Sequence, residues 1–234
     1  MVLKRLLAVV LAAMLACMAL SACAAQDKQE KTGLSGIKII VDPGHGDIDI
    51  GTTGVLTGRY EKEVNLEIGL KLQAALEKEG ATVVMTRESD EPIAAEEETD
   101  VLKRKEADMQ RREEIITTSQ ADMYIGVHQN SFEDKTIAGP QVFYYTDSAA
   151  GKELASCIQA VMNEQLQPAA PRTINCGRYR LLKPGNQPSV TVECGFFTNA
   201  EEEKKLQTEE YQKKVVTAIV DGIKRYAAEN LNAE

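Results

Sequence analysis

Two hydrophobic periods alternate along this chain. Residues 37–42 (IKIIVD) form a continuous apolar run of strand length, which is typical of a strand buried on both faces. Residues 61–80 instead place apolar side chains three and four positions apart and stop at Gly80, which predicts a helix. A second short apolar run follows at 82–86. This order of strand, helix and strand is the signature of α/β proteins.

The same alternation continues to the C-terminus. The pattern predicts a helix with a highly charged face at 101–119, strands at 121–128 and 140–145, a helix at 148–166, short strands at 178–183 and 188–193, and an amphipathic helix from about 201 to 230. We therefore predict one α/β domain with a central, mostly parallel, twisted sheet and helices on both faces. No internal repeat or second domain is evident.

The first 35 residues have a different character. Residues 1–22 predict a signal peptide, because a basic start precedes an apolar stretch shorter than the about 20 residues of a spanning helix. The segment LSAC, which ends at Cys23, resembles the bacterial lipoprotein signal, in which cleavage precedes a lipidated cysteine. An ordinary secretory signal or an uncleaved anchor stays open. Residues 23–35 are polar and without pattern, which predicts a flexible tether before a domain at 36–234.

These features predict an exported lipoprotein, anchored through Cys23 on the extracytoplasmic face of a membrane. The chain carries a formal charge of −9, with 27 basic and 36 acidic residues. That balance disfavours nucleic acid as a partner and also disfavours a polybasic membrane patch.

The cysteines give little support for a disulfide framework or a thiolate metal site. Without Cys23, three cysteines follow the tether, and no CxxC pair exists. A single bridge between Cys157 and Cys176 stays open.

Polar residues capable of chemistry follow several of the predicted strands. The only two histidines are His45, in the turn VDPGHG after the first strand, and His128, at the end of a later one. Glu193 ends the last strand, and Glu61 opens the helix after the His45 turn. Ligands of open α/β sheets bind beyond the carboxyl ends of the strands. Two imidazoles and a carboxylate form a His₂Glu zinc set, and a second carboxylate beside it can act as general base.

Each of these residues also has a simpler interpretation. His45 could hydrogen-bond within its own turn, and His128 could be a core histidine. Glu61 could be an acid favoured by the helix macrodipole. Glu193 is harder to explain in this way, because a carboxylate within an apolar run is costly unless it is paired. Spacing alone leaves a metal hydrolase as one interpretation among these.

Four separated segments occur in a specific order: IIVDPGHG, YEKEVNLEIGLKL, ADMYIGVHQNS and VTVECGFFTNAEEEKKL. Together they resemble the zinc-dependent N-acetylmuramoyl-L-alanine amidases of the type 3 amidase family, over about residues 36–230. The resemblance implies that His45, Glu61 and His128 bind Zn²⁺ and that Glu193 is the catalytic carboxylate. It also implies peptidoglycan as the substrate, cleaved at the amide between N-acetylmuramic acid and L-alanine. We expect a monomer.

The sequence departs from the family pattern at three positions. Asp47 stands where a second glycine is common, Gln129 where a small residue is usual, and Cys194 where a small residue such as Thr or Ile is common. We expect Gln129 and Cys194 to narrow the substrate groove. Glu63 competes with Glu61 as a ligand, but a two-residue shift turns a helical side chain by about 200°, so both cannot face one metal.

Further residues are candidates for supporting roles. Asn130 and Asn199 match motif positions, whereas Arg111, Arg112 and Lys183 are expected to be solvated charges rather than substrate contacts. Inhibited members of the family carry an added helix between the second histidine and the catalytic glutamate. We expect no such helix here, since that span is filled by one strand, one helix and two short strands.

Two other functions stay open. The chain could be a non-catalytic peptidoglycan-binding lipoprotein on the same fold, or another zinc hydrolase of cell-wall peptides or sugars.

Overall fold

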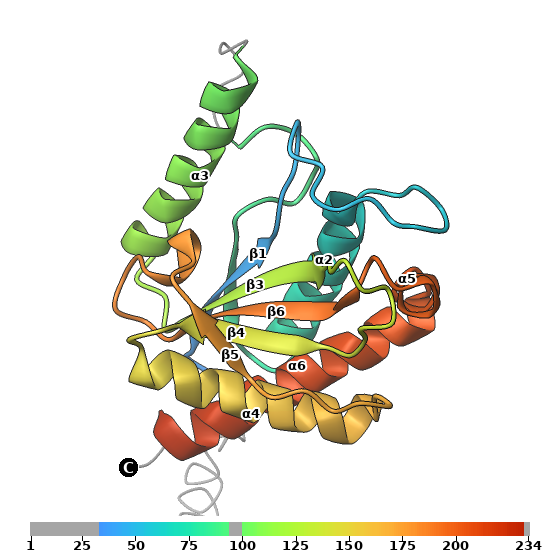
Figure 1. Ribbon diagram of the computed structural model, residues 1–234. Coiled ribbons are helices and arrows are strands. Elements are labelled where there is room, and N and C mark those ends of the chain that lie inside the picture. The colour runs from blue at the N-terminus through green and yellow to red at the C-terminus, as the bar shows by residue number, and fades with distance from the viewer. Residues whose placement is uncertain (1–32, 94–99, 232–234) are drawn as a thin grey trace, which may run out of the picture. The chain divides into compact units, whose positions relative to one another are not determined.

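A computed structural model describes residues 33–93 and 100–231. Within them, six strands form one sheet in the order β2-β1-β3-β6-β4-β5 (Figure 1). The strands are β1 (Lys38–Pro43), β2 (Thr82–Met85), β3 (Met123–Asn130), β4 (Gln141–Tyr145), β5 (Asn175–Gly177) and β6 (Ser189–Phe196). All neighbouring pairs are parallel except β4 with β6. The predicted mostly parallel sheet is therefore confirmed.

Helices lie on both faces of the sheet, as predicted, but they cover the two faces unequally. The helices are α2 (Glu61–Lys78), α3 (Val101–Thr118), α4 (Ala149–Leu166), α5 (Ala200–Leu206) and α6 (Glu209–Asn230), with a short 3₁₀ turn η1 (Arg180–Leu182). The main core lies between one face and α2, α4 and α6. A much smaller cluster covers the second face, where Ile116 of α3 and Leu182 of η1 meet Ile40 and Tyr124.

β1 shows why the first apolar run has no polar alternation. Ile39 and Val41 belong to the main core, while Ile40, between them, belongs to the cluster on the second face. All three side chains are fully buried. A strand covered on both faces needs apolar residues at every position, which is what the run predicts.

The predicted strand at 178–183 is wrong. The strand here is Asn175–Gly177, and the chain then turns into η1, which buries Leu182 against the second face. Arg180 donates to the carboxylates of Glu106 and Glu113 on α3, at 2.6 to 2.9 Å. A short apolar run cannot by itself distinguish these two structures.

The predicted C-terminal helix is two helices. Asn199 caps the first through its side-chain oxygen, which accepts from the backbone N–H groups of Glu201 and Glu202. Thr208 then caps α6 by accepting from Tyr211 N. Each capping side chain satisfies helix N–H groups that would otherwise lack a partner, so a second helix begins where the amphipathic pattern alone predicts continuity.

Between His128 and Glu193 the single α-helix is α4, whose buried residues belong to the main core. Among the described cysteines, Cys157, Cys176 and Cys194 are free thiols, so the bridge between Cys157 and Cys176 is not formed. No helix in the described part of the chain is long and apolar enough to cross a membrane. The predictions for residues 1–32 lie outside the described residues.

The contact between α4 and α6 depends on Gly222. A Cβ at this position would lie 2.6 Å from the backbone Cα of Ile158, closer than packed atoms approach. We predict that Gly222→Ala destabilises the protein by about 1–2 kcal/mol, because overpacking at a rigid backbone exceeds the about 1 kcal/mol gain in helix propensity. Thermal unfolding should show a midpoint about 2–8 °C lower. Thr217→Ala, at an exposed position of α6, is the control. A more stable Gly222→Ala variant would contradict this account.

Candidate active site

The predicted site residues gather at one edge of the sheet. β1, β3 and β6 are neighbouring parallel strands, and His128 on β3 lies directly opposite Glu193 on β6. His45 follows β1, and Glu61 is the first residue of α2. The carboxyl ends of parallel strands meet at one edge, so these four residues, distant in sequence, come together there.

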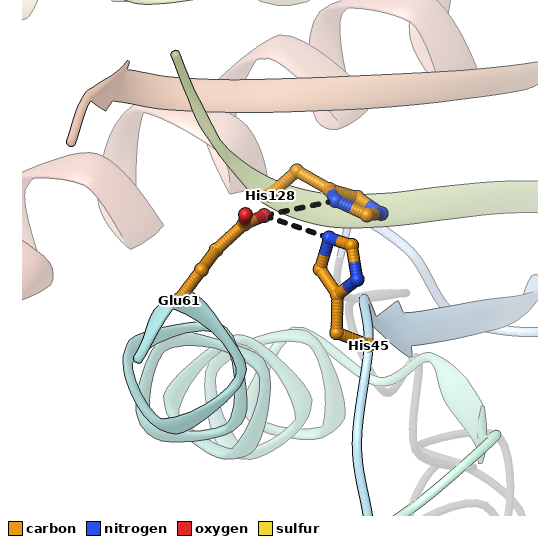
Figure 2. A group of neighbouring side chains, drawn as sticks. All are labelled: His45, Glu61 and His128. Atoms are coloured by element: carbon orange, nitrogen blue, oxygen red, sulfur yellow. Dashed lines mark hydrogen bonds and ion pairs between the residues drawn. The ribbon is translucent and has the colours of Figure 1, made fainter. Parts of the chain in front are cut away.

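Three of them form a compact cluster of metal-binding groups. His45, Glu61 and His128 each offer one ligand atom, and these atoms lie within 4.8 Å of one another. Figure 2 shows Glu61 pointing from the start of α2 toward both imidazoles, with Oε1 at 3.2 Å from His45 Nε2 and 3.1 Å from His128 Nδ1. The Glu61 side chain is 3% exposed and each imidazole 24%. Two nitrogens and a carboxylate oxygen are a donor set suited to zinc.

Glu61, rather than Glu63, joins the histidines. Glu63 is exposed and accepts from the Arg59 guanidinium at 3.2 Å. Glu61 Oε2 accepts from Thr52 N at 2.8 Å, and its Oε1 accepts from the amide of Asn65 and the backbone N–H of Gln129 at 3.2 and 3.1 Å. These contacts hold the carboxylate in one orientation.

The turn VDPGHG brings its histidine against the cluster because its backbone is unusual. His45 has φ +62°, a left-handed conformation that is rare for residues other than glycine. A Cβ on Gly44 would lie 2.1 Å from His128 Cε1, and a Cβ on Gly51 would lie 2.6 Å from Glu61 Oε2. Glycine at both positions leaves the space in which the imidazole and the carboxylate lie.

Two arginines hold this turn through its backbone carbonyls. Arg112 donates to the carbonyls of Pro43 and His45 at 3.1 and 2.6 Å. Arg87 donates to those of Pro43 and Gly44 at 2.8 and 3.1 Å. Arg112 is only 1% exposed, so its predicted role as a solvated charge is wrong. Three consecutive carbonyls that would otherwise be buried without partners are thereby satisfied by charge-assisted hydrogen bonds.

Arg112 also pairs with Asp42, which is fully buried beneath the turn. Tyr124 and Thr86 donate hydroxyl hydrogens to the same carboxylate. Burial raises the pKa of Asp42, but the Arg112 charge and these two hydrogen bonds outweigh it, so the pKa lies below its ordinary value. Asp42 is therefore ionised at neutral pH and gives Arg112 its counter-charge.

Asp49, which the sequence does not single out, orients His45. Its Oδ2 lies 2.7 Å from His45 Nδ1, and its Oδ1 lies 2.7 Å from Lys105 Nζ on α3. Burial alone would lower the pKa of His45, but Asp49 and Glu61 raise it to about 9. With Nδ1 facing Asp49, the His45 nitrogen that faces Glu61 is Nε2, the arrangement that carboxylates impose on metal-binding histidines.

Glu193 lies beside the cluster rather than within it. Glu193 and the three clustered residues line one pocket of about 230 Å³. The Glu193 Oε2 atom is buried and has no hydrogen-bond partner among the described residues. Burial of the carboxyl raises its pKa to about 7, even though the two imidazoles act to lower it. Such a carboxyl can both take up and release a proton near neutral pH.

The other predicted residues have mixed outcomes. Gln129 is 3% exposed and donates to Asn65 Oδ1 at 3.1 Å, and Cys194 is fully buried in the main core. Cys194 therefore does not narrow the substrate groove, and that part of the prediction is wrong. Gln129 lines the pocket that contains the four site residues, and its effect on a substrate stays a prediction. Arg111 and Lys183 are exposed, as expected. Asn130 accepts from the backbone of the next residue, so it shapes the end of β3.

Comparison with known proteins shows the family of this chain. The family profile described as N-acetylmuramoyl-L-alanine amidase matches residues 39–225. The chain belongs to this family. The match spans all four residues, from His45 to Glu193.

Individual relatives agree. The germination-specific N-acetylmuramoyl-L-alanine amidase of Bacillus subtilis is 35% identical over 197 residues, 84% of this chain and 82% of that protein. The amidase LytC of the same organism is 32% identical, with 85% of this chain and 37% of LytC covered. The CwlD amidase of Clostridioides difficile, solved in complex with the GerS lipoprotein, is 37% identical, with a TM-score of 0.81 and coverage of 83% of this chain and 100% of that one.

The buried pair of Asp42 and Arg112 should dominate the stability of this edge. We predict that Arg112→Met lowers the free energy of unfolding by about 3–5 kcal/mol, because Asp42 keeps a buried charge without its partner. Arg111→Met, which removes only an exposed pair with Glu114, should change it by less than about 1 kcal/mol. Urea unfolding of both variants measures the difference.

The dependence of stability on pH provides a second check on the ion pair of Asp42 and Arg112. A lowered folded-state pKa means that Asp42 stabilises the fold above its unfolded pKa of about 4 and loses this effect as pH falls through the folded value. The gap between wild type and Arg112→Met should therefore narrow below about pH 4. Equal stability of the Arg111 and Arg112 variants at pH 7 would contradict the role of the pair.

Proposed function

We propose that this protein is a zinc-dependent enzyme that hydrolyses the amide between N-acetylmuramic acid and L-alanine in peptidoglycan. The observation that carries the proposal is the His₂Glu cluster with a second carboxyl, Glu193, in the same pocket. Family membership and the printed names of the relatives support the substrate.

We propose His45, Glu61 and His128 as the residues that hold the metal. The donor set, its burial and the contact between Asp49 and His45 Nδ1 all fit a zinc site. When bound there, zinc lowers the pKa of a water molecule and polarises the amide carbonyl. Three protein ligands leave a position open for this chemistry, as in other catalytic zinc sites.

Glu193 is proposed to move the proton. Its free Oε2 takes a proton from the attacking water and then passes it to the nitrogen of L-alanine as the amide bond breaks. A raised pKa suits both steps, because an acid with a pKa near the working pH can accept and donate in turn. The position of Glu193 opposite His128 keeps it next to the cluster without making it a fourth ligand.

We predict that Glu193→Gln retains one bound zinc per chain and loses activity on purified peptidoglycan by about 10²–10⁴-fold, the scale of general acid–base catalysis. His45→Ala should instead lose the zinc. Metal analysis gives the zinc content, and mass spectrometry of released products gives the activity and the bond cleaved.

The products separate this function from its alternatives. Stem peptides with a free L-alanine N-terminus indicate amidase action, whereas released acetate indicates a deacetylase. Zinc binding without any product in the wild type would favour a peptidoglycan-binding lipoprotein. Turnover retained in Glu193→Gln would remove that residue from the mechanism.

We also propose that the chain is an exported lipoprotein with a signal peptide at 1–22, a lipid on Cys23 with a tether at 23–35, and the amidase domain at 36–234. The name of a relative, the probable cell wall amidase LytH of Staphylococcus aureus, supports an extracytoplasmic location. We also propose that the protein acts as a monomer, since His45, Glu61, His128 and Glu193 of a single chain are sufficient to form the pocket.

Lipidation at Cys23 has a direct test. We predict that the full chain, expressed in a bacterium, incorporates radiolabelled palmitate and partitions with membranes, and that Cys23→Ser loses both, because stable anchoring needs acyl chains. Cys176→Ser, at an exposed cysteine of the folded domain, is the matched control. Labelling that persists in Cys23→Ser would contradict the assignment.

A further inference from the structure

Two further hollows adjoin the pocket that is lined by Glu193 and by the cluster of His45, Glu61 and His128. A broad groove of about 640 Å³ shares Thr52 and Ser131 with this pocket. A narrower cavity of about 260 Å³, on the second face of the sheet, shares His45, His128 and Glu193 with it. The described residues that line the two hollows do not overlap, so the two are separate spaces beside the same pocket. A substrate that is cleaved at the cluster extends from the scissile bond in two directions. Each hollow can therefore hold one of its two parts.

An exposed phenylalanine lines the broad groove. Phe196 and Phe197 are buried and Phe143 is half-buried, but Phe132 is 56% exposed. Its backbone is held in place, since its N–H donates to Thr198 Oγ1 at 3.0 Å and its carbonyl accepts from Lys135 Nζ at 3.1 Å. An exposed aromatic ring alone carries no meaning. This ring, however, is held beside the pocket of the metal cluster.

The other residues of this groove are hydroxyl-bearing or charged: Thr52, Ser131, Glu133, Lys135 and Thr198. An aromatic ring among such groups matches a sugar, whose pyranose ring has apolar C–H faces and a rim of hydroxyl groups. A glycan strand also extends in both directions from each muramic acid. It therefore needs the larger of the two hollows.

The cavity on the second face is smaller than the broad groove, and its wall combines aromatic and aliphatic side chains with several charged ones. Phe143 and Tyr179 meet edge to face in its wall, with ring centroids 5.6 Å apart, and Leu181 and Leu182 line it as well. Arg180 lines the same cavity, but its guanidinium is already bound to two carboxylates of α3. This space is smaller than the broad groove, and Glu193 lies in its wall but not in that of the groove, so it suits the L-alanine end of a stem peptide better than a polymeric sugar.

We propose that the broad groove beside Phe132 binds the glycan strand. The cavity on the second face, beside Tyr179, then receives the stem peptide, beginning with its L-alanine. This assignment rests on the proposed amidase function and gives the substrate a direction across the site. The amine leaving group then lies on the cavity side, where Glu193 can protonate it.

The test uses the full chain and two probes that differ only in the sugar. One probe is an N-acetylmuramoyl peptide, and the other is the D-lactyl peptide without the sugar ring. Phe132→Ala should raise KM about tenfold for the first probe, change kcat by less than about twofold, and leave the second probe unaffected, because uniform binding of the sugar is lost. Phe132→Tyr should restore KM. Tyr179→Ala should raise KM for both probes alike.

Leu102→Ala, at a position 77% exposed on α3, is the control for loss of an exposed apolar side chain. Equal effects of Phe132→Ala on both probes, or a sugar-specific effect of Tyr179→Ala, would overturn the assignment. If the wild type cleaves neither probe, the proposed function fails separately. Dissociation constants of both probes for wild type and Phe132→Ala then decide, and equal weakening of the two overturns the inference.

Discussion

The edge of the sheet that carries the site residues depends on a buried ion pair between Asp42 and Arg112, which lie far apart in the sequence. Asp42 is buried near the end of β1, and Arg112 reaches it from α3 while also binding the carbonyls of the histidine turn. A left-handed His45 and its neighbouring glycines would otherwise leave that turn with several backbone conformations to choose from. The ion pair is stable in the interior only because the guanidinium also has hydrogen-bond acceptors for its other N–H groups. Arg112 thus both holds the histidine turn in place and neutralises the charge of Asp42.

This constraint explains the unusual character of α3. The other long helices bury apolar stripes in the main core, whereas the buried residues of α3 are Arg112 and Ile116. Its remaining links to the edge are ionic, from Arg104 to Asp47 and from Lys105 to Asp49. Since exposed pairs contribute little individually, α3 is positioned chiefly by its one buried arginine and a small apolar contact. A charged helix can therefore support a catalytic site without contributing much to the core.

The fold was predictable from hydrophobic periodicity, and the expected strand ends made His45, His128 and Glu193 candidates, but it was the resemblance to the amidase family that favoured them over their simpler interpretations. Apolar runs locate the strands, and parallel strands bring the residues at their carboxyl ends to one edge. The supporting residues were not predictable in this way. Arg112 contacts Asp42 seventy positions away, on a helix whose charged pattern resembles a solvated surface. Local pattern carries no information about a contact over that distance. Asp49 and Asn65 lie only four positions from their partners, His45 and Glu61, but nothing in the sequence distinguishes them from the other polar residues nearby.

The two carboxylates of the site show how environment assigns different roles to the same chemical group. Glu61 is surrounded by donors and both imidazoles, and these lower its pKa well below the usual range despite its burial. Glu193, on β6, has a buried oxygen without a donor among the described residues, and burial raises its pKa to about 7. One is therefore suited to remain an anion that holds a cation, and the other to exchange a proton. An unsatisfied buried oxygen destabilises the fold, so its presence beside the cluster argues that it serves the chemistry rather than the stability of the protein.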